Sequence, residues 1–206
     1  MVARVATTAL ELADWRRKVH ALYAGVRAED DPAQGYALWR AGRDDLFASH
    51  PQSPLTVDDS LRTTGVPYWS YNPSLRWTLA VEPVEAPVHR SVATGATEVT
   101  NMSQLGWITL PAPMDARLAV WWLEQYGGGI FVPVRDATAG HSTYGAGRYL
   151  LDTAKGADLG GTDSSVVVDL NFLYHPSCRY DPQWICPLAP AENTIAVAIE
   201  AGERLP

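Results

Sequence analysis

The segment from Asp136 to Arg148 gathers the kinds of groups that bind small polar ligands. It holds a carboxylate, several hydroxyls, three glycines, one histidine and one arginine. Glycine lets a ligand approach the backbone closely, and arginine is the best planar partner for a carboxylate or phosphate. We predict that Arg148 anchors an anion, with Asp136 and Thr138 beside it. The alternative is a purely structural hairpin, in which Asp136 caps the turn and Arg148 forms an internal ion pair.

A second candidate site lies further along the chain, in the run 165–174. Side chains alternate between the faces of a strand, so Asp169 and Asn171 share one face between apolar neighbours. A buried carboxylate must find a partner, or its pKa rises. We expect Arg148 to be that partner and Asp169 to be the general acid or base, positioned by Asn171 and Tyr144, with Asn171 also holding a substrate oxygen. The alternative is that this face of the strand is only solvated.

The two cysteines, Cys178 and Cys186, are eight positions apart, which is not the spacing of a zinc knuckle. A turn containing Pro182 and Pro187 can fold them together, so we predict that the two structural thiols are neighbours, either reduced or bridged. Nothing in the sequence points to flavin, nicotinamide or haem, and we expect neither a cofactor nor a metal. A metal site built from His141, His175 and the two thiols is the alternative.

These residues must be positioned by a helical N-terminal part and a β-rich body. Within residues 1–50, an apolar stripe at steps of three and four predicts a first helix, with Thr8 and Glu11 as its capping box: Leu12, Trp15, Val19, Leu22 and Val26. Asp31 and Pro32 start a second helix, which ends near His50.

After Pro51, frequent prolines exclude long helices, and short β-branched and aromatic runs predict strands. We expect them at 76–81, 98–101, 105–110, 118–126, 130–135, 148–152, 165–174 and 195–200. Tyr126 and three following glycines predict a tight hairpin. The fold class is therefore α+β and mainly antiparallel, a barrel or strongly curled sheet with two N-terminal helices, forming one domain over residues 1–206. The polar connection 153–164 is either a mobile loop or a lid.

Composition excludes several kinds of partner. The formal net charge of −7 and the pI near 5.1 argue against nucleic acid and anionic membranes, which both need clustered Lys and Arg. No run reaches the roughly 20 apolar residues of a membrane span, and the N-terminus does not resemble a signal peptide. We expect a cytoplasmic protein with a small-molecule ligand, and the sequence is compatible with a homodimer.

Several of these segments together resemble a bacterial family catalogued as domain of unknown function 1684. The resemblance rests on residues 134–140, 143–150 and 168–171, and on Tyr174, Pro176, Cys178, 186–188, 192–193 and 201–203. It implies that the following residues form one constellation: Asp136, Thr138, Tyr144, Arg148, Asp169, Asn171, Cys178, Cys186 and Asn193. The chain departs from the family at His175 and Ser177, where the family has Asn and Pro, and at Ala189. Such divergence suits a member recruited to a specialised substrate.

Together these observations predict a small-molecule enzyme that uses acid/base chemistry without an organic redox cofactor. It would isomerise, cyclise, eliminate or hydrolyse a small polar or carboxylate-bearing metabolite. Asp169, Tyr144 and Arg148 would be catalytic, and substrate would bind to Asp136, Thr138, Arg148, Asn171 and Asn193. The alternatives are a non-catalytic ligand-binding or scaffolding protein, in which the same polar cluster is a satisfied network, and a metalloenzyme.

Overall fold

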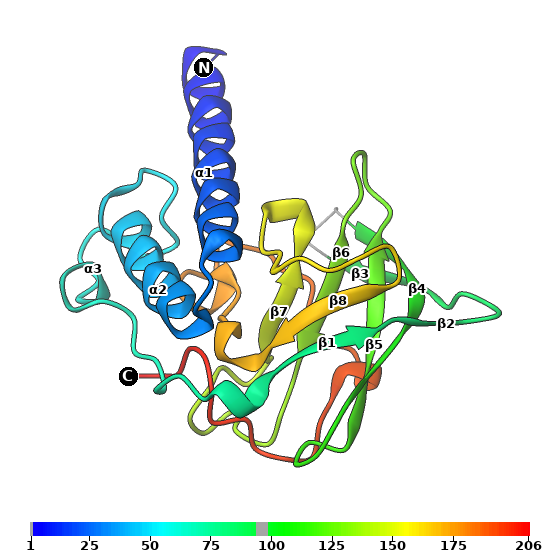
Figure 1. Cartoon of the computed structure of the whole chain (residues 1–206). Coiled ribbons are helices and arrows are strands. Elements are labelled where there is room, and N and C mark those ends of the chain that lie inside the picture. The colour runs from blue at the N-terminus through cyan, green and yellow to red at the C-terminus, as the bar shows by residue number, and fades with distance from the viewer. Residues whose placement is uncertain (1, 94–98) are drawn as a thin grey trace.

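Two long helices flank a β-rich body in the computed structural model, which describes residues 2–93 and 99–206. Helices α1 (Val2–Ala28) and α2 (Pro32–Ser49) pack against each other, and α1 projects well beyond the body (Figure 1). As predicted, the Asp31 side chain caps α2, accepting a hydrogen bond of 2.9 Å from the backbone of Ala33. The predicted capping box is wrong, because α1 already begins at Val2 and Thr8 lies inside it. A short helix, α3 (Leu61–Thr64), follows.

Aromatic side chains join the two long helices to the body. Trp39 of α2 is fully buried, and its indole N–H donates to the Tyr23 hydroxyl of α1 over 3.0 Å. The Trp39 ring also packs on Phe172 of the body, with 5.0 Å between ring centroids. The apolar stripe seen in the sequence therefore faces the body, as amphipathic helices do.

The strands form one six-stranded sheet and one separate ribbon. They are β1 (Arg76–Ala80), β2 (Glu82–Pro83), β3 (His89–Ala93), β4 (Val99–Leu110), β5 (Ala116–Leu123), β6 (Ile130–Val134), β7 (Arg148–Asp152) and β8 (Ser165–Asp169). The sheet runs β2-β4-β5-β6-β7, with β3 also on β4, whereas β1 and β8 pair only with each other. All of these strand pairs are antiparallel, so the predicted α+β class with mainly antiparallel strands is confirmed.

The predicted barrel or strongly curled sheet is wrong. In the described part of the chain, the β1–β8 ribbon does not connect the two edges of the six-stranded sheet. Instead, apolar side chains of the ribbon, such as Val166 and Val168, pack against sheet residues that include Val120 and Val132. Pro133 in β6 has no N–H to donate and lies at a register shift opposite the edge strand β7.

Several of the predicted strands differ from those in the structure. The runs at 98–101 and 105–110 belong to the single strand β4, and position 98 lies outside the described residues. The run 165–174 stops at Asp169, whose carboxylate caps a 3-10 turn, η3 (Leu170–Phe172). The run 195–200 is not a strand; it follows the turn η5 (Ala191–Asn193) as extended chain. The remaining short turns are η1 (Pro73–Leu75), η2 (Thr153–Lys155) and η4 (Ser177–Arg179).

Candidate functional site

Arg148 does not pair with Asp169, and its two terminal nitrogens are bonded elsewhere, while its buried Nε has no partner among the described residues. Its guanidinium is buried, pairs with Asp136 Oδ2 at 2.9 Å, and donates to the Ile199 and Glu203 carbonyls at 2.9 and 3.0 Å. It also donates to the carbonyl of Ala201. These contacts fasten the C-terminal segment to β7, so the geometry fits the structural alternative for Arg148 and not an anion anchor.

Asp136 and Thr138 belong to the same buried network. The backbone N–H and hydroxyl of Thr138 donate to Asp136 Oδ1 at 2.9 and 2.6 Å, and the backbone of Ile199 adds a third donor at 3.1 Å. Burial opposes ionisation of Asp136, but the charge of Arg148 and the Thr138 hydrogen bonds outweigh it, and the pKa is lowered. The Asp136 carboxylate is therefore satisfied within the protein.

Asp169 and Asn171 form a second network, about a different arginine. Asp169 is fully buried; Oδ1 accepts from the Asn171 backbone and side chain at 3.0 and 2.7 Å, and Oδ2 pairs with Arg76 at 3.3 Å. Burial raises the pKa of Asp169, as the sequence suggested, while Asn171 and Arg76, in place of Arg148, oppose the rise. Asn171 also bonds the N–H and carbonyl of Asn72, each at 2.8 Å.

Asn193 and Tyr144 lie in two further places. Asn193 is fully buried, accepts from the Trp121 indole at 2.8 Å and donates to the carbonyl of Ala119 at 2.9 Å, which fixes the C-terminal segment to β5. Tyr144 lies beside Cys178, with 4.0 Å between hydroxyl and sulfur. The residues that the family resemblance grouped are therefore divided among separate networks.

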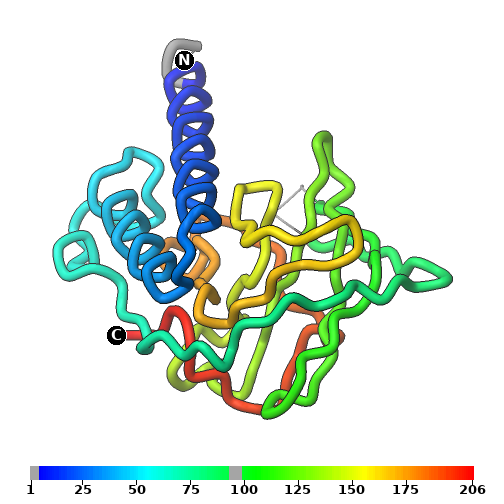
Figure 2. Tube along the Cα trace, in the orientation of Figure 1, coloured from blue at the N-terminus to red at the C-terminus, as the bar shows by residue number. Residues whose placement is uncertain are grey.

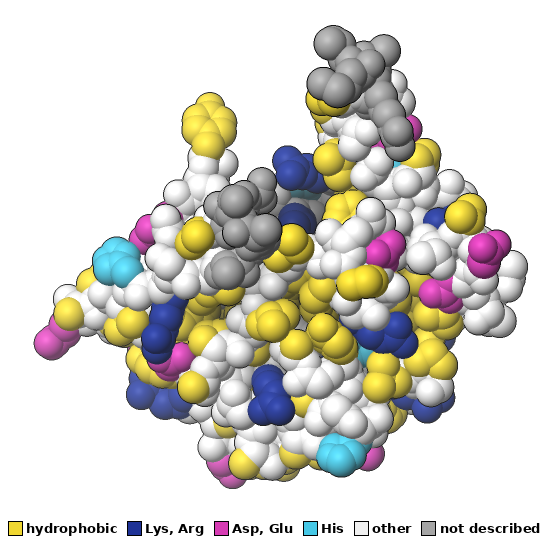
Figure 3. All heavy atoms as spheres, turned by 180° about the vertical axis from the view of Figure 1, so that it is seen from behind, with side chains coloured by type: hydrophobic (Ala, Val, Ile, Leu, Met, Phe, Trp, Pro, Cys, Tyr) yellow, Lys and Arg dark blue, Asp and Glu magenta, His cyan; other side chains and the backbone are white. Residues whose placement is uncertain are grey.

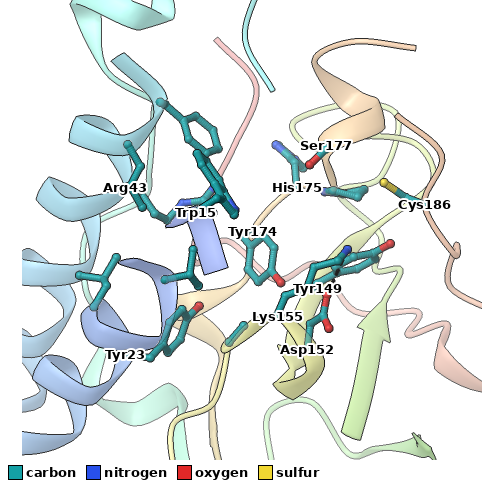
Figure 4. A pocket seen from close by; sticks show the side chains of 16 residues that line it. Trp15, Tyr23, Arg43, Tyr149, Asp152, Lys155, Tyr174, His175, Ser177 and Cys186 are labelled. Atoms are coloured by element: carbon teal, nitrogen blue, oxygen red, sulfur yellow. Dashed lines mark ion pairs between the residues drawn. The ribbon is translucent and has the colours of Figure 1, made fainter. Parts of the chain in front are cut away.

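A cavity lies between the two long helices and the end of β7. This helix–sheet pocket has a volume of about 660 Å³, its open mouth included. Its helical wall is mainly apolar, and Figure 4 shows polar side chains on the opposite wall. The lining residues are Trp15, Val19, Leu22, Tyr23, Arg43, Leu46, Phe47, Tyr149, Asp152, Lys155, Ala157, Tyr174, His175, Pro176, Ser177 and Cys186. An apolar cavity with a few converging polar groups is the usual form of a small-molecule site.

Asp152 is the group in this pocket with unused binding capacity. It ends β7, and its side chain is only 3% exposed. Oδ2 lies 3.5 Å from the Lys155 ammonium one turn later, whereas Oδ1 is buried and accepts no hydrogen bond from the described residues. A buried carboxylate oxygen without a donor is costly, so a ligand that brings an O–H or N–H group gains that interaction.

Three tyrosines supply neutral hydroxyls around Asp152. Burial raises the pKa of Tyr23, Tyr149 and Tyr174, so all three remain protonated at neutral pH. Tyr149 donates to the carbonyl of Pro187 at 2.5 Å, and Tyr23 accepts from Trp39. The Tyr174 hydroxyl points towards Tyr149 and Lys155 (Figure 4), where it can donate a hydrogen bond to an oxygen of a bound molecule.

The two thiols are neighbours, as predicted. Both pack in one cluster, and the nearby Cys178 thiol lowers the pKa of Cys186, against the opposing effect of burial; the Cys178 backbone and Lys155 act in the same direction as the thiol. The same contact raises the pKa of Cys178, together with burial. Cys186 lines the helix–sheet pocket, and both cysteines are free.

His175 has no lone pair left for a metal. Its Nε2 accepts from the Tyr144 backbone at 3.1 Å, so the ring proton is on Nδ1, which faces Glu203 at 2.8 Å. His141 is exposed, and no cluster of three or more His, Cys, Asp or Glu side chains suited to a metal exists within residues 2–93 and 99–206. The alternative metal site of His141, His175 and the thiols is therefore not assembled in this part of the chain.

Few features of the sequence point to this site. Asp152 was only the last residue of a predicted strand, and Lys155 was one polar residue in the connection 153–164. The one available signal was an acidic residue that ends a buried strand directly before a glycine-containing polar loop. The helical wall could not be predicted, because Trp15 and Phe47 face Asp152 only after the chain has folded.

Comparisons with known proteins agree with the fold but bring no activity. A solution NMR structure of an uncharacterised protein from Haloarcula marismortui superimposes with a TM-score of 0.57 and 27% identity, over 81% of this chain and 90% of that one. No curated protein has a similar sequence. No helix in the described ranges is long and apolar enough to cross a membrane. The model of the family described as "Protein of unknown function (DUF1684)" matches residues 62–204, and the chain therefore belongs to that family.

Proposed function

We propose that the protein is an acid/base enzyme without an organic redox cofactor, and that its substrate binds in the helix–sheet pocket. The observation that supports this is the buried, unpaired Oδ1 of Asp152 in the wall of an aromatic cavity. A carboxylate without a protein donor is free to take a proton from a bound molecule. Asp152 thus takes the role of base that the sequence suggested for Asp169, whose oxygens are already bonded to Asn171 and Arg76.

The neighbouring groups suit proton transfer in a carbonyl-bearing substrate. If Asp152 removes a proton next to a carbonyl group, negative charge develops on the carbonyl oxygen. The Tyr174 hydroxyl and the Lys155 ammonium lie on the same wall (Figure 4) and can stabilise that oxygen. The reaction is then an isomerisation or elimination, in which the proton returns to a second atom or a leaving group departs.

The charges around the mouth of the pocket favour a substrate with a carboxylate. A second, more open groove shares Asp152 and Lys155 with the pocket and is also lined by Arg16 and His20. Figure 3 shows dark blue Lys and Arg side chains around a hollow beside α1. Arg16 has no carboxylate partner among the described residues. We therefore propose an apolar substrate body in the pocket and a carboxylate in the outer groove.

Hydrogen–deuterium exchange tests this proposal without knowledge of the product. A library of small aromatic and aliphatic keto and hydroxy acids is first screened for shifts of the Trp15 indole NMR signal, with exposed Trp122 as reference. Molecules that bind are then incubated with the protein in D₂O, and loss of their C–H signals is followed. We expect the natural protein to catalyse this exchange and Asp152→Asn to slow it at least about 100-fold. The Trp15 signal of Asp152→Asn should still shift when the molecule is added, which shows that binding is retained.

The matched control is Asp163→Asn. Asp163 is an exposed carboxylate in the loop that contains Lys155, so this variant should catalyse C–H exchange as fast as the natural protein does. Binding at Trp15 without any exchange would contradict catalysis and favour the ligand-binding alternative. Exchange that survives in Asp152→Asn would exclude Asp152 as the base.

A further inference from the structure

Cys178 and Cys186 are held together at the edge of the helix–sheet pocket. Cys178 stands in η4, directly after Pro176 and Ser177 of the pocket wall, while Cys186 returns after a turn and lines the pocket itself. The hydroxyl of Tyr149 fixes the carbonyl of Pro187 next to Cys186 at 2.5 Å. Tyr144 lies against the sulfur of Cys178. The turn between the cysteines is fixed as well, because the Asp181 carboxylate accepts from the backbone of Gln183 at 2.9 Å.

The two sulfurs differ in access and in environment. Cys186 is buried and lines the pocket, with Lys155 in the same lining. Cys178 is half-buried, lies against Tyr144 and is not among the residues that line the pocket. The sulfur that meets an incoming molecule is thus the one that is more readily a thiolate, and the thiolate is the nucleophilic form of cysteine. The proposed acid/base function makes no use of this arrangement.

We propose that Cys186 and Cys178 are a redox pair, in which Cys186 reduces a hydroperoxide that enters the helix–sheet pocket and Cys178 resolves the product into an intramolecular disulfide. The Cys186 thiolate attacks one peroxide oxygen and the O–O bond breaks. Sulfur keeps that oxygen as a sulfenic acid, and the other oxygen leaves as alkoxide or hydroxide and takes a proton from water. The Cys178 sulfur then attacks the sulfenic sulfur; an S–S bond forms, and hydroxide leaves with the Cys178 proton as water.

In total, two thiols are oxidised to one disulfide, and one hydroperoxide is reduced to an alcohol or water. A dithiol reductant returns the pair to thiols by exchange, which completes a cycle. The apolar helical wall of the pocket favours an organic hydroperoxide over hydrogen peroxide. Because a disulfide requires neighbouring sulfurs, the existing contact between the two thiols removes most of the rearrangement that bridging would need.

Alkylation of the natural chain tests the order of reactivity. The folded protein is treated at pH 7 with less than one equivalent of iodoacetamide, and the labelled peptides are quantified by mass spectrometry. We expect Cys186 to carry at least about tenfold more label than Cys178, because it holds the larger thiolate fraction. Equal labelling, or a preference for Cys178, would overturn the assignment of roles.

Peroxide treatment tests the pair itself. One equivalent of hydrogen peroxide or of cumene hydroperoxide should remove both free thiols of the natural protein, lower its mass by two hydrogens and form no disulfide bond between chains. In Cys178→Ser the reaction should stop at a Cys186 sulfenic acid, trapped by dimedone, and in the Cys178→Ser/Cys186→Ser variant no hydroperoxide should be consumed. Disulfide-linked dimers, or stable sulfinic acid in the natural protein, would refute resolution by Cys178. An intact Asp152-dependent exchange alongside such a failure would leave the proposed function standing.

Discussion

At the scale of single residues, the polar groups that stand out in the sequence are mostly used for structure. Arg148 satisfies three backbone carbonyls and one carboxylate, and Asn171 bonds both polar groups of the Asn72 backbone. Asp152, in contrast, keeps one buried oxygen without a donor. Buried polar groups are almost always satisfied in folded proteins. Among the described residues, the few buried side-chain atoms without a partner include Arg148 Nε, but only Asp152 Oδ1 belongs to a residue that lines the helix–sheet pocket, which makes it a better guide to chemistry than the richest cluster.

The structural role of Arg148 leads to a strong effect on stability. Arg148→Ala leaves the buried Asp136 carboxylate without its charge partner, and we expect a loss of about 3–5 kcal/mol in the free energy of unfolding. Urea denaturation measures it. The double variant Arg148→Ala/Asp136→Ala should lose less than the sum of the single variants, because each single variant leaves one buried charge unpaired and the double variant leaves none.

Arg135→Ala is the matched control for Arg148→Ala. Arg135 is exposed and makes one side-chain hydrogen bond, to the carbonyl of Gly145 at 2.9 Å, so its removal should cost less than about 1 kcal/mol. If Arg148→Ala were as mild as this control, the network around Asp136 would not hold the C-terminal segment, and Arg148 would again be available as a ligand anchor.

At the scale of elements, local sequence patterns predicted which helices and strands form, whereas long-range contacts determine how those elements pair and pack. The stripe from Leu12 to Val26 predicts a helix because the spacing is local, and Asp31 caps α2 through a residue two positions away. The pairing of β1 with β8 joins residues such as Trp77 and Val168, far apart in the chain. No local pattern shows that pairing, and without it a barrel was a reasonable expectation for consecutive antiparallel strands.

Asp169 shows how a single cap ends a predicted strand. Its carboxylate accepts from the backbone N–H of Asn171 and turns the chain into η3, although the alternation of side chains up to Tyr174 favours a longer strand. Short polar side chains compete with strand pairing in this way. The prediction of a buried Asp169 next to Asn171 survives, because both residues belong to the turn, but its partner Arg76 comes from β1.

The raised pKa of Asp169 predicts a pH dependence at this turn. Burial makes the folded state hold the Asp169 proton more tightly than the unfolded chain does. The stabilisation from protonated Asp169 is therefore complete below its ordinary pKa of 3.8 and is lost as the pH rises through the folded-state value. Asp169→Asn lacks this dependence, so its disadvantage relative to the natural protein should shrink between pH 4 and pH 7 in urea titrations.

Asp163→Asn, an exposed carboxylate in the loop before β8, should show the same difference from the natural protein at both pH values. If the disadvantage of Asp169→Asn instead grew with pH, the ionised carboxylate and its pair with Arg76 would be the stabilising form, and the pKa of Asp169 would be lowered in the folded state.

At the scale of the whole molecule, the C-terminal segment joins parts of the chain that are distant in sequence. It contacts β7 through Arg148, β5 through Asn193 and α2 through Glu203, and Figure 2 shows it running from beneath the sheet to the segment after α3. The backbone of Trp69 donates to the carbonyl of Gly202 at 3.0 Å. Gly202 has a φ of 73°, and a Cβ there would lie 2.4 Å from the carbonyl oxygen of Leu173, so only glycine fits this crossing.

The helix–sheet pocket depends on the same long-range organisation. Its helical wall stands on α1 and α2, which precede the residues matched by the family model, whereas Asp152, Tyr174 and Cys186 lie within them. The polar wall of such a site lies within the residues that the family pattern covers. The apolar wall lies outside them and reaches the site only because the helices pack against the body. The charged group that links the two halves is Arg43, which lines the pocket from α2 and pairs with Glu203.

Glu203 should therefore be among the most sensitive positions for stability. Its fully buried carboxylate accepts from Arg43 at 2.8 Å, from the backbone and ring of His175 at 2.9 and 2.8 Å, and from the hydroxyl of Tyr180. In Glu203→Gln one oxygen becomes an NH₂ group that faces donors, and Arg43 loses its counter-charge. We expect a loss of about 3–5 kcal/mol in the free energy of unfolding at pH 7.

The dependence on pH distinguishes this role from a simple packing defect. Burial opposes ionisation of Glu203, but His175 and Arg43 outweigh it and lower the pKa below the ordinary value of 4.5. The stabilisation is thus complete above pH 4.5 and is lost as the pH falls through the folded-state value, so the cost of Glu203→Gln should shrink in acid. Urea titrations at pH 7 and pH 4 measure this, with exposed Glu200→Gln as the control. A cost that is equal at both pH values would show that the shape of Glu203, and not its charge, holds the helices to the C-terminal segment.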